Sequence, residues 1–162
     1  MNKKVLYSTI KRVAFVAVFG YFLPIFIGIR FDSLLFFQKT SFWFSPLLGI
    51  FLFFFGLFLI FGGIANLISF GEGSPNPSFP TKKLVKKGLY RFMRHPIYFG
   101  WLTIILAASI YFSSISILVF LFIIMIFVYF YAKKEEKIME RRFGRDYLNY
   151  KRKVRGWIPK IL

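Results

Sequence analysis

The residues best able to do chemistry gather in two short segments, at the start and the end of one apolar stretch. Arg94-His95-Pro96 precedes the stretch, and Glu135-Glu136 follows it. Pro96 keeps the preceding residue out of the helical region and suits the first turn of a helix. The free N–H groups of that turn favour an anion, and Arg94 and His95 can donate charge-assisted hydrogen bonds to a carboxylate or phosphate. Alternatively, these cations only reach towards lipid headgroups.

The glutamate pair also has two interpretations. Three of the chain's six acidic residues lie within residues 133–140. Adjacent carboxylates at a helix end can hold ribose hydroxyls or an ammonium group. The same spacing fits a solvated helix face, on which Glu136 and Glu140 lie four residues apart.

A third polar segment, residues 143–159, is rich in aromatic and basic side chains. Such a segment can act as a lid or gate over a site. It can equally be an anchor in the membrane interface, where aromatic and basic residues are common.

Long apolar runs must position these segments. Hydrophobic residues make up 57% of the chain, against ~45–50% in soluble domains. The runs cover residues 13–29, 47–70 and 97–132. The last is too long for one crossing of a ~30 Å core, so we expect it to break at Ser113–Ser116 into two helices. The fold expected is a single all-α integral membrane domain over residues 1–162. It has four membrane helices, the last two a tight hairpin, with a basic cytosolic loop and a C-terminal helix.

The charge distribution predicts the orientation and the partners. The formal net charge is +17, and of the basic residues only Arg30 and Lys39 fall outside the N-terminus, the middle loop and the tail. With four crossings, the positive-inside rule places both termini in the cytoplasm, at the cell (inner) membrane. Basic residues beside apolar spans favour anionic headgroups over nucleic acid as the partner. With no cysteine and His95 as the single histidine, neither a disulfide nor a metal site is expected.

In the second half of the chain these segments occur in an order that resembles the isoprenylcysteine carboxyl methyltransferase and phospholipid methyltransferase superfamily. The resemblance extends from Gly71 to Pro159. It rests on Gly71-x-Gly73-x-Pro75-x-Pro77, Leu84-Val85-x-x-Gly88-x-Tyr90, Arg94-His95-Pro96-x-Tyr98-x-Gly100, Glu135-Glu136, Phe143-Gly144-x-x-Tyr147 and Tyr150.

The resemblance implies S-adenosylmethionine as cofactor, bound in a site built from about residues 71–100 and 133–159. Arg94 and Glu136 are the expected catalytic residues. The expected cofactor contacts are Gly88, Leu89, Tyr90, His95, Pro96, Tyr98, Gly100, Glu135 and Glu136. The acceptor would be lipid-borne, as for an isoprenylcysteine carboxyl methyltransferase. A phospholipid N-methyltransferase and a non-enzymatic basic lipid-binding module are the alternatives, and the oligomeric state stays open.

Overall fold

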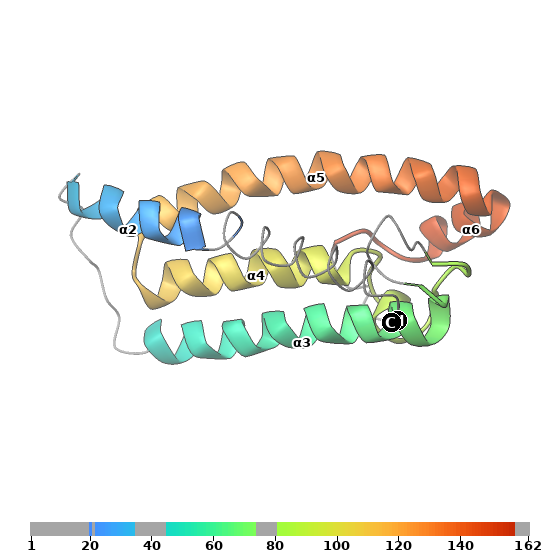
Figure 1. Cartoon of the computed structure of the whole chain (residues 1–162), viewed down its shortest axis with the longest axis horizontal. Helices are drawn as coiled ribbons and strands as arrows, with labels where there is room; N and C mark the ends of the chain where they lie inside the picture. Colours follow the sequence, from blue (N-terminus) through green and yellow to red (C-terminus); the bar gives the residue numbers. More distant parts are fainter. Residues whose placement is uncertain (1–19, 21, 35–44, 74–80, 158–162) are drawn as a thin grey trace, which may run out of the picture. The chain divides into compact units, whose positions relative to one another are not determined.

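The computed structural model describes residues 20, 22–34, 45–73 and 81–157, and every regular element within these ranges is helical. The elements are α2 (Leu23–Leu34), α3 (Ser45–Gly71), the 3-10 turn η2 (Gly88–Arg91), α4 (Pro96–Tyr111), α5 (Ile115–Phe143) and α6 (Arg145–Lys153) (Figure 1). The chain divides into unit 1, residues 1–53 and 105–122, and unit 2, residues 54–104 and 123–162. All the residues expected to form the site belong to unit 2.

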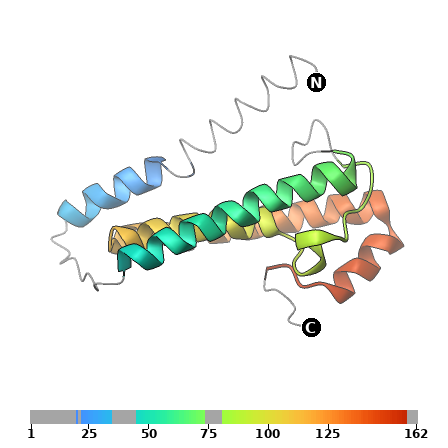
Figure 2. The same cartoon turned by 90° about the horizontal axis from the view of Figure 1, so that it is seen from below.

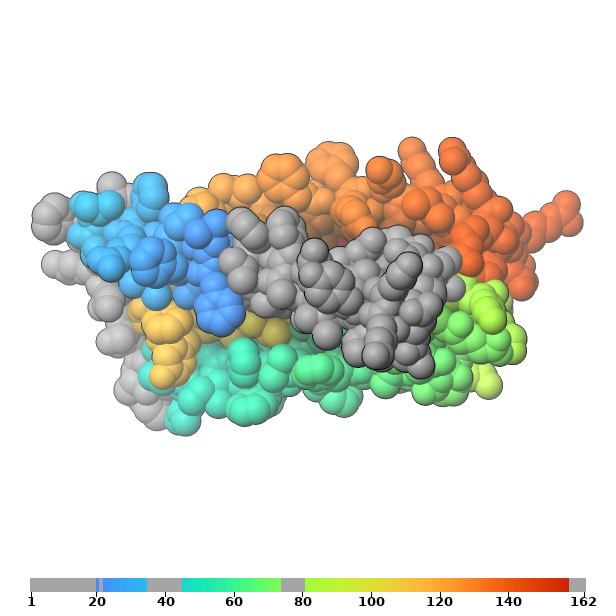
Figure 3. All heavy atoms as spheres, viewed as in Figure 1, coloured from blue at the N-terminus to red at the C-terminus, as the bar shows by residue number. Residues whose placement is uncertain are grey.

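Two helices of the described part of the chain are long and apolar enough to cross a membrane. They are α3, with 27 residues, and α5, with 29. Both carry large apolar side chains that are exposed, such as Phe58 at 60% and Phe127 at 70%, and both present side chains at the molecular surface (Figure 3). A lipid environment would cover such surfaces. Helix α4 is apolar but has only 16 residues, so of the four expected crossings the described residues contain two candidates.

The first apolar run differs from its expected bounds. The apolar run of the sequence ends at residue 29, but α2 continues to Leu34. Within unit 1, Asp32 of this helix is buried, and its Oδ1 accepts a hydrogen bond of 3.0 Å from the backbone N–H of Ser116. That bond satisfies one of the free N–H groups at the start of α5. Most of residues 13–22, where the first membrane helix was expected to begin, lie outside the described residues.

The break expected at the serine cluster is confirmed. Helix α4 ends at Tyr111 and α5 begins at Ile115. The hydroxyl of Ser114 accepts a hydrogen bond of 3.1 Å from the N–H of Ile117, as an N-cap does. The hydroxyl of Ser109 donates to the carbonyl of Ser114 at 3.0 Å. The serines therefore satisfy backbone groups that the interrupted helix leaves free.

Within unit 2, glycines allow α3 and α4 to lie side by side (Figure 2). A Cβ on Gly100 would lie 2.7 Å from the carbonyl oxygen of Gly56, and a Cβ on Gly56 would lie 2.8 Å from that of Gly100. The two helices also approach each other at Ile97, nearer the start of α4. There a Cβ on Gly63 would lie 2.7 Å from Ile97 Cγ1. Small residues permit this close backbone approach between membrane helices. The contact positions the start of α4, and with it the Arg94-His95-Pro96 segment.

Candidate active site

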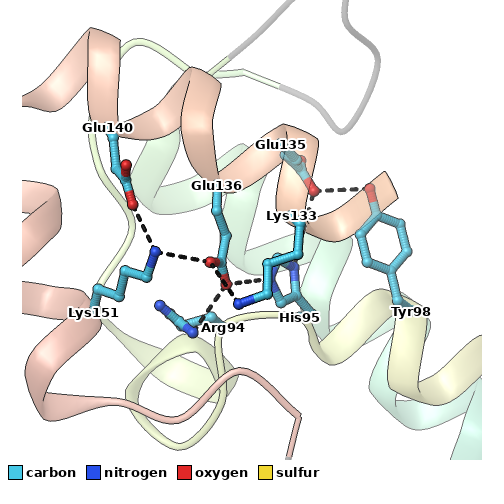
Figure 4. A network of polar contacts seen from close by, with 8 residues as sticks. All are labelled: Arg94, His95, Tyr98, Lys133, Glu135, Glu136, Glu140 and Lys151. Carbon is cyan, nitrogen blue, oxygen red and sulfur yellow. Dashed lines mark hydrogen bonds and ion pairs between the residues drawn. The ribbon is translucent and has the colours of Figure 1, made fainter. Parts of the chain in front are cut away.

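Glu136 lies at the centre of a polar cluster beside the start of α4 (Figure 4). Its side chain is 4% exposed. Oε1 lies 2.9 Å from Nη2 of Arg94 and 3.1 Å from Nε2 of His95, and Oε2 lies 3.1 Å from Nζ of Lys151. A carboxylate this far from water needs such partners to stay ionised. Oε1 is therefore occupied by the protein's own side chains, whereas the buried Oε2, although close to Lys151, has no hydrogen-bond partner among the described residues.

Arg94 uses only part of its donor capacity on this contact. Its side chain is 10% exposed, and Nη2 pairs with Glu136. Nε and Nη1 are buried, and neither has a hydrogen-bond partner among the described residues. Because unsatisfied buried donors cost free energy, they indicate a group that the side chains of the described residues do not supply. A planar anion such as a carboxylate matches the geometry of a guanidinium.

His95 combines polar contacts with ring contacts. Its ring stacks on that of Tyr98, with centroids 5.6 Å apart, and lies 5.4 Å from that of Trp157. Its backbone carbonyl accepts a hydrogen bond from the N–H of Phe99 at 3.0 Å, in the first turn of α4. Since Pro96 follows, the backbone of His95 leaves the helix direction at this point. The ring of Trp157 also lies 6.4 Å from that of Tyr98, so the three rings form one aromatic group.

The two adjacent glutamates have different surroundings. Glu135 accepts a hydrogen bond of 2.8 Å from the hydroxyl of Tyr98, and its side chain is 38% exposed. Nδ1 of His95 lies 3.9 Å from the same carboxylate oxygen. Glu136 is buried among four basic groups, the fourth being Lys133 with its Nζ 4.0 Å from Oε2, whereas Glu135 keeps acceptor capacity that a ligand can use.

The C-terminal segment completes the cluster from the other side. The N–H groups of Arg94 and His95 donate to the carbonyls of Arg155 and Gly156, at 3.0 and 3.1 Å. The hydroxyl of Tyr150 donates to the carbonyl of Tyr90 at 2.7 Å. Below these contacts is a small apolar cluster made of Tyr147, Tyr150, Val154, Leu84, Met139 and Phe143.

The side chain of Lys151, on α6, contacts two glutamates of α5. Its Nζ lies 2.6 Å from Oε1 of Glu140 and 3.1 Å from Oε2 of Glu136. The hydrogen bond with Glu140 raises the pKa of Lys151 above its ordinary value, and the one with Glu136 acts in the same direction. Burial raises the pKa values of Tyr90 and Tyr150, so both phenols keep their protons at neutral pH.

The structure brings together Arg94, His95, Tyr98, Glu135 and Glu136, which we expected to share a site. It gives other expected residues a packing role. Gly88 has a φ of +61°, and its α-carbon faces the Asn66 side chain, so no Cβ fits there. The Leu89 side chain lies against Gly62, and Gly100 lies against Gly56. Pro96 is fully buried. For all the residues expected to bind S-adenosylmethionine, that contact stays a prediction.

Sequence reasoning missed two members of the cluster. Lys151 and Trp157 were read only as parts of a lid or an anchor. No spacing rule connects Lys151 to Glu136, because the turn at Gly144, with a φ of +53°, sets how α6 folds back on α5. Trp157 is brought to the cluster by the backbone hydrogen bonds between residues 94–95 and 155–156. The sequence alone does not reveal these bonds.

Comparison with known proteins places this cluster in a wider group. Residues 44–146 match the family described as phospholipid methyltransferase. The chain is 30% identical over 111 residues to a protein-S-isoprenylcysteine O-methyltransferase of Dictyostelium discoideum, covering 64% of this chain and 47% of the relative. It is 33% identical over 79 residues to the enzyme of that name from Saccharomyces cerevisiae, covering 48% of this chain and 33% of the relative. The matched region thus spans less than half the length of these relatives. No solved structure matches the chain significantly.

Proposed function

The chain belongs to the phospholipid methyltransferase family, and from this premise we propose that it transfers a methyl group from S-adenosylmethionine to a lipid-borne acceptor at the cytoplasmic membrane face. One observation carries the proposal. Two buried donors of Arg94 have no partner among the described residues, and Arg94 lies with His95, Tyr98, Glu135 and Glu136 in the matched segment. A carboxylate such as that of the cofactor's amino acid would satisfy them.

The other residues of the cluster fit the remaining parts of the cofactor. The carboxylate of Glu135 suits its ammonium group or its ribose hydroxyls. The rings of His95, Tyr98 and Trp157 offer flat surfaces for the adenine or the sulfonium, since aromatic faces attract cations. When bound, S-adenosylmethionine supplies an activated methyl group.

Glu136 is better suited to positioning than to direct contact with the ligand. With 4% of its side chain exposed and with Oε1 shared by Arg94 and His95, it holds these two side chains in one arrangement. Preorganisation of this kind lowers the cost of aligning reactants. The protein's contribution to the reaction is therefore the alignment of donor and acceptor rather than a covalent step.

The names of the curated relatives favour a carboxylate acceptor on an isoprenylated cysteine. A carboxylate oxygen accepts a methyl group without losing a proton, so such an acceptor needs no general base. A phospholipid amine must lose a proton to a base. That alternative is favoured by the description of the matched family.

Cofactor binding separates an enzyme from a non-enzymatic lipid-binding module. We expect the purified full chain in detergent to bind S-adenosylmethionine saturably in the micromolar range, which is usual for enzyme substrates. Isothermal titration calorimetry measures this directly. The absence of saturable heat from a folded sample would leave the module as the correct interpretation.

The membrane arrangement forms part of the proposal. Helices α3 and α5 are the two candidate spans of the described residues. We propose that residues before Leu34 and helix α4 supply two further crossings. Both termini would then lie in the cytoplasm, on the side where the cluster meets soluble S-adenosylmethionine.

A further inference from the structure

A basic hollow lies outside the cluster around Glu136. It has a volume of about 420 Å³, and its lining residues are Lys86, Arg91, Phe92, Asn149, Tyr150, Lys153 and Val154. Three of them are cationic and none is acidic. None of the residues that contact Glu136 takes part in the lining, although Tyr150, which donates to the carbonyl of Tyr90, borders both places.

No acidic side chain of the described residues lines this hollow. All six acidic side chains lie among the described residues. Glu72 pairs with Lys83, Glu140 with Lys151, and Asp32 with the backbone of Ser116. Glu135 and Glu136 belong to the cluster described above, and Asp146 approaches Lys86 no closer than 3.9 Å.

Among the described residues, Arg91 and Lys153 therefore have no carboxylate side chain as a counter-charge. Neither has an ion pair with any side-chain carboxylate of the described residues. Two uncompensated cations and an amide donor facing one hollow are suited to an anion with several acceptor oxygens. A phosphate group has this chemistry.

The position of the hollow in the chain indicates where the phosphate comes from. Its lining includes residues between the end of α3 at Gly71 and the start of α4 at Pro96, two apolar helices. Such a segment lies at the level of the headgroups if both helices enter the membrane. Phe92, which is 42% exposed, adds an aromatic side chain of the kind found at that level. A second hollow of about 510 Å³ shares Lys86 and is lined by three more lysines.

We propose that the hollow between η2 and α6 binds the phosphate of an anionic phospholipid headgroup, as a site separate from that of the methyl acceptor. The lipid would tie α6 to the membrane surface through Arg91 and Lys153. Because α6 also carries Lys151, the bound lipid would support the corner in which Glu136 lies. The proposal requires only lipid binding and does not depend on methyl transfer.

Native mass spectrometry of the full chain in detergent tests the proposal without S-adenosylmethionine. Short-chain phosphatidylglycerol is titrated against phosphatidylcholine of equal chain length, with glycerol phosphate as the soluble competitor. The test variant is Arg91→Gln with Lys153→Gln. The matched control is Lys134→Gln with Lys137→Gln, which removes the same charge from exposed positions of α5 outside both hollows.

We expect the wild type to prefer phosphatidylglycerol, and the test variant to lose about tenfold or more in affinity for it while the control keeps its affinity. The conservative variant Arg91→Lys with Lys153→Arg should retain most of the binding. That result would show that the test variant loses affinity because charge is removed and not because the protein unfolds. Equal losses of affinity in the test and control variants would mean that only the general positive charge of the protein attracts the lipid. That result would overturn the proposal. Equal affinity for the two lipids, or full competition by glycerol phosphate at the lipid's own concentration, would also overturn it.

Discussion

Arg94 and Glu136 form a buried ion pair with 2.9 Å between Nη2 and Oε1, joining the chain just before α4 to the charged end of α5. The pair orients the guanidinium so that one nitrogen is used, while Nε and Nη1 have no partner among the described residues. Our interpretation of the site rests on this division: Glu136 holds the arginine, and the arginine holds the ligand.

Replacing Glu136 with alanine should destabilise the protein strongly. The change leaves Arg94, His95 and Lys151 around an empty buried position. Breaking a buried ion pair costs about 3–5 kcal/mol. Glu135→Ala is the matched control, because it removes a neighbouring carboxylate that is 38% exposed and has a single hydrogen bond, worth about 0.5–1.5 kcal/mol. Thermal unfolding in detergent compares the two variants. A similar loss of stability in the two variants would contradict the conclusion that the ion pairs of Glu136 hold the cluster together.

Arg94→Lys should weaken binding of S-adenosylmethionine by about ten- to hundredfold, because hydrogen bonds to a charged group contribute about 1.5–3 kcal/mol. Lysine keeps the charge but loses the planar fork. Arg91→Lys serves as the control, since Arg91 lies outside the cluster. Calorimetric titration measures both affinities. If Arg94→Lys binds like the wild type, the two buried donors do not hold the cofactor.

Gly100→Ala distinguishes packing from cofactor contact at a residue expected to do the latter. An added methyl group meets the carbonyl of Gly56 at 2.7 Å, and overpacking of this kind costs about 1–3 kcal/mol. We expect a lower unfolding temperature with unchanged affinity for S-adenosylmethionine in the folded protein. A large loss of affinity at unchanged stability would instead assign Gly100 to the cofactor site.

Reporter fusions at Met1 and Leu162 test the proposed orientation. The distribution of basic residues predicts that a reporter active only in the cytoplasm works at both ends. A sandwich fusion after Ser113, in the turn between α4 and α5, should report the opposite side and serves as the control. A reporter at either terminus that is active only outside the cytoplasm would contradict the four-crossing arrangement.

The helices were predicted most accurately where the signal comes from neighbouring residues in the sequence. The run of residues 47–70 became α3 with its bounds within two residues, because an apolar stretch of that length has few other structures available. The serines between α4 and α5 marked a break because their side chains can satisfy backbone groups there. The extension of α2 to Leu34 was missed, since its buried Asp32 finds its partner at Ser116, far along the chain.

Part of the cluster's membership was predictable from the sequence, but the roles of its residues were not. The order of motifs brought Arg94, His95, Tyr98 and the glutamates together, although spacing along α5 could not say which glutamate is buried. That depends on Lys151 approaching from α6 and on Arg94 from the start of α4. Gly100 was expected at the cofactor because it lies in the same motif, yet its contact with Gly56 explains a glycine at that position by packing.

Transfer of a radiolabelled methyl group from S-adenosylmethionine tests the central claim most directly. The purified full chain is incubated with the labelled cofactor and, in parallel, with an isoprenylated cysteine peptide and a phospholipid extract. Arg94→Lys is the matched variant. We predict that label enters one of these lipid-borne acceptors with the wild type and that transfer falls at least tenfold with the variant. If folded protein that binds S-adenosylmethionine labels neither acceptor, or if Arg94→Lys transfers at the wild-type rate, the proposed reaction and its site are contradicted.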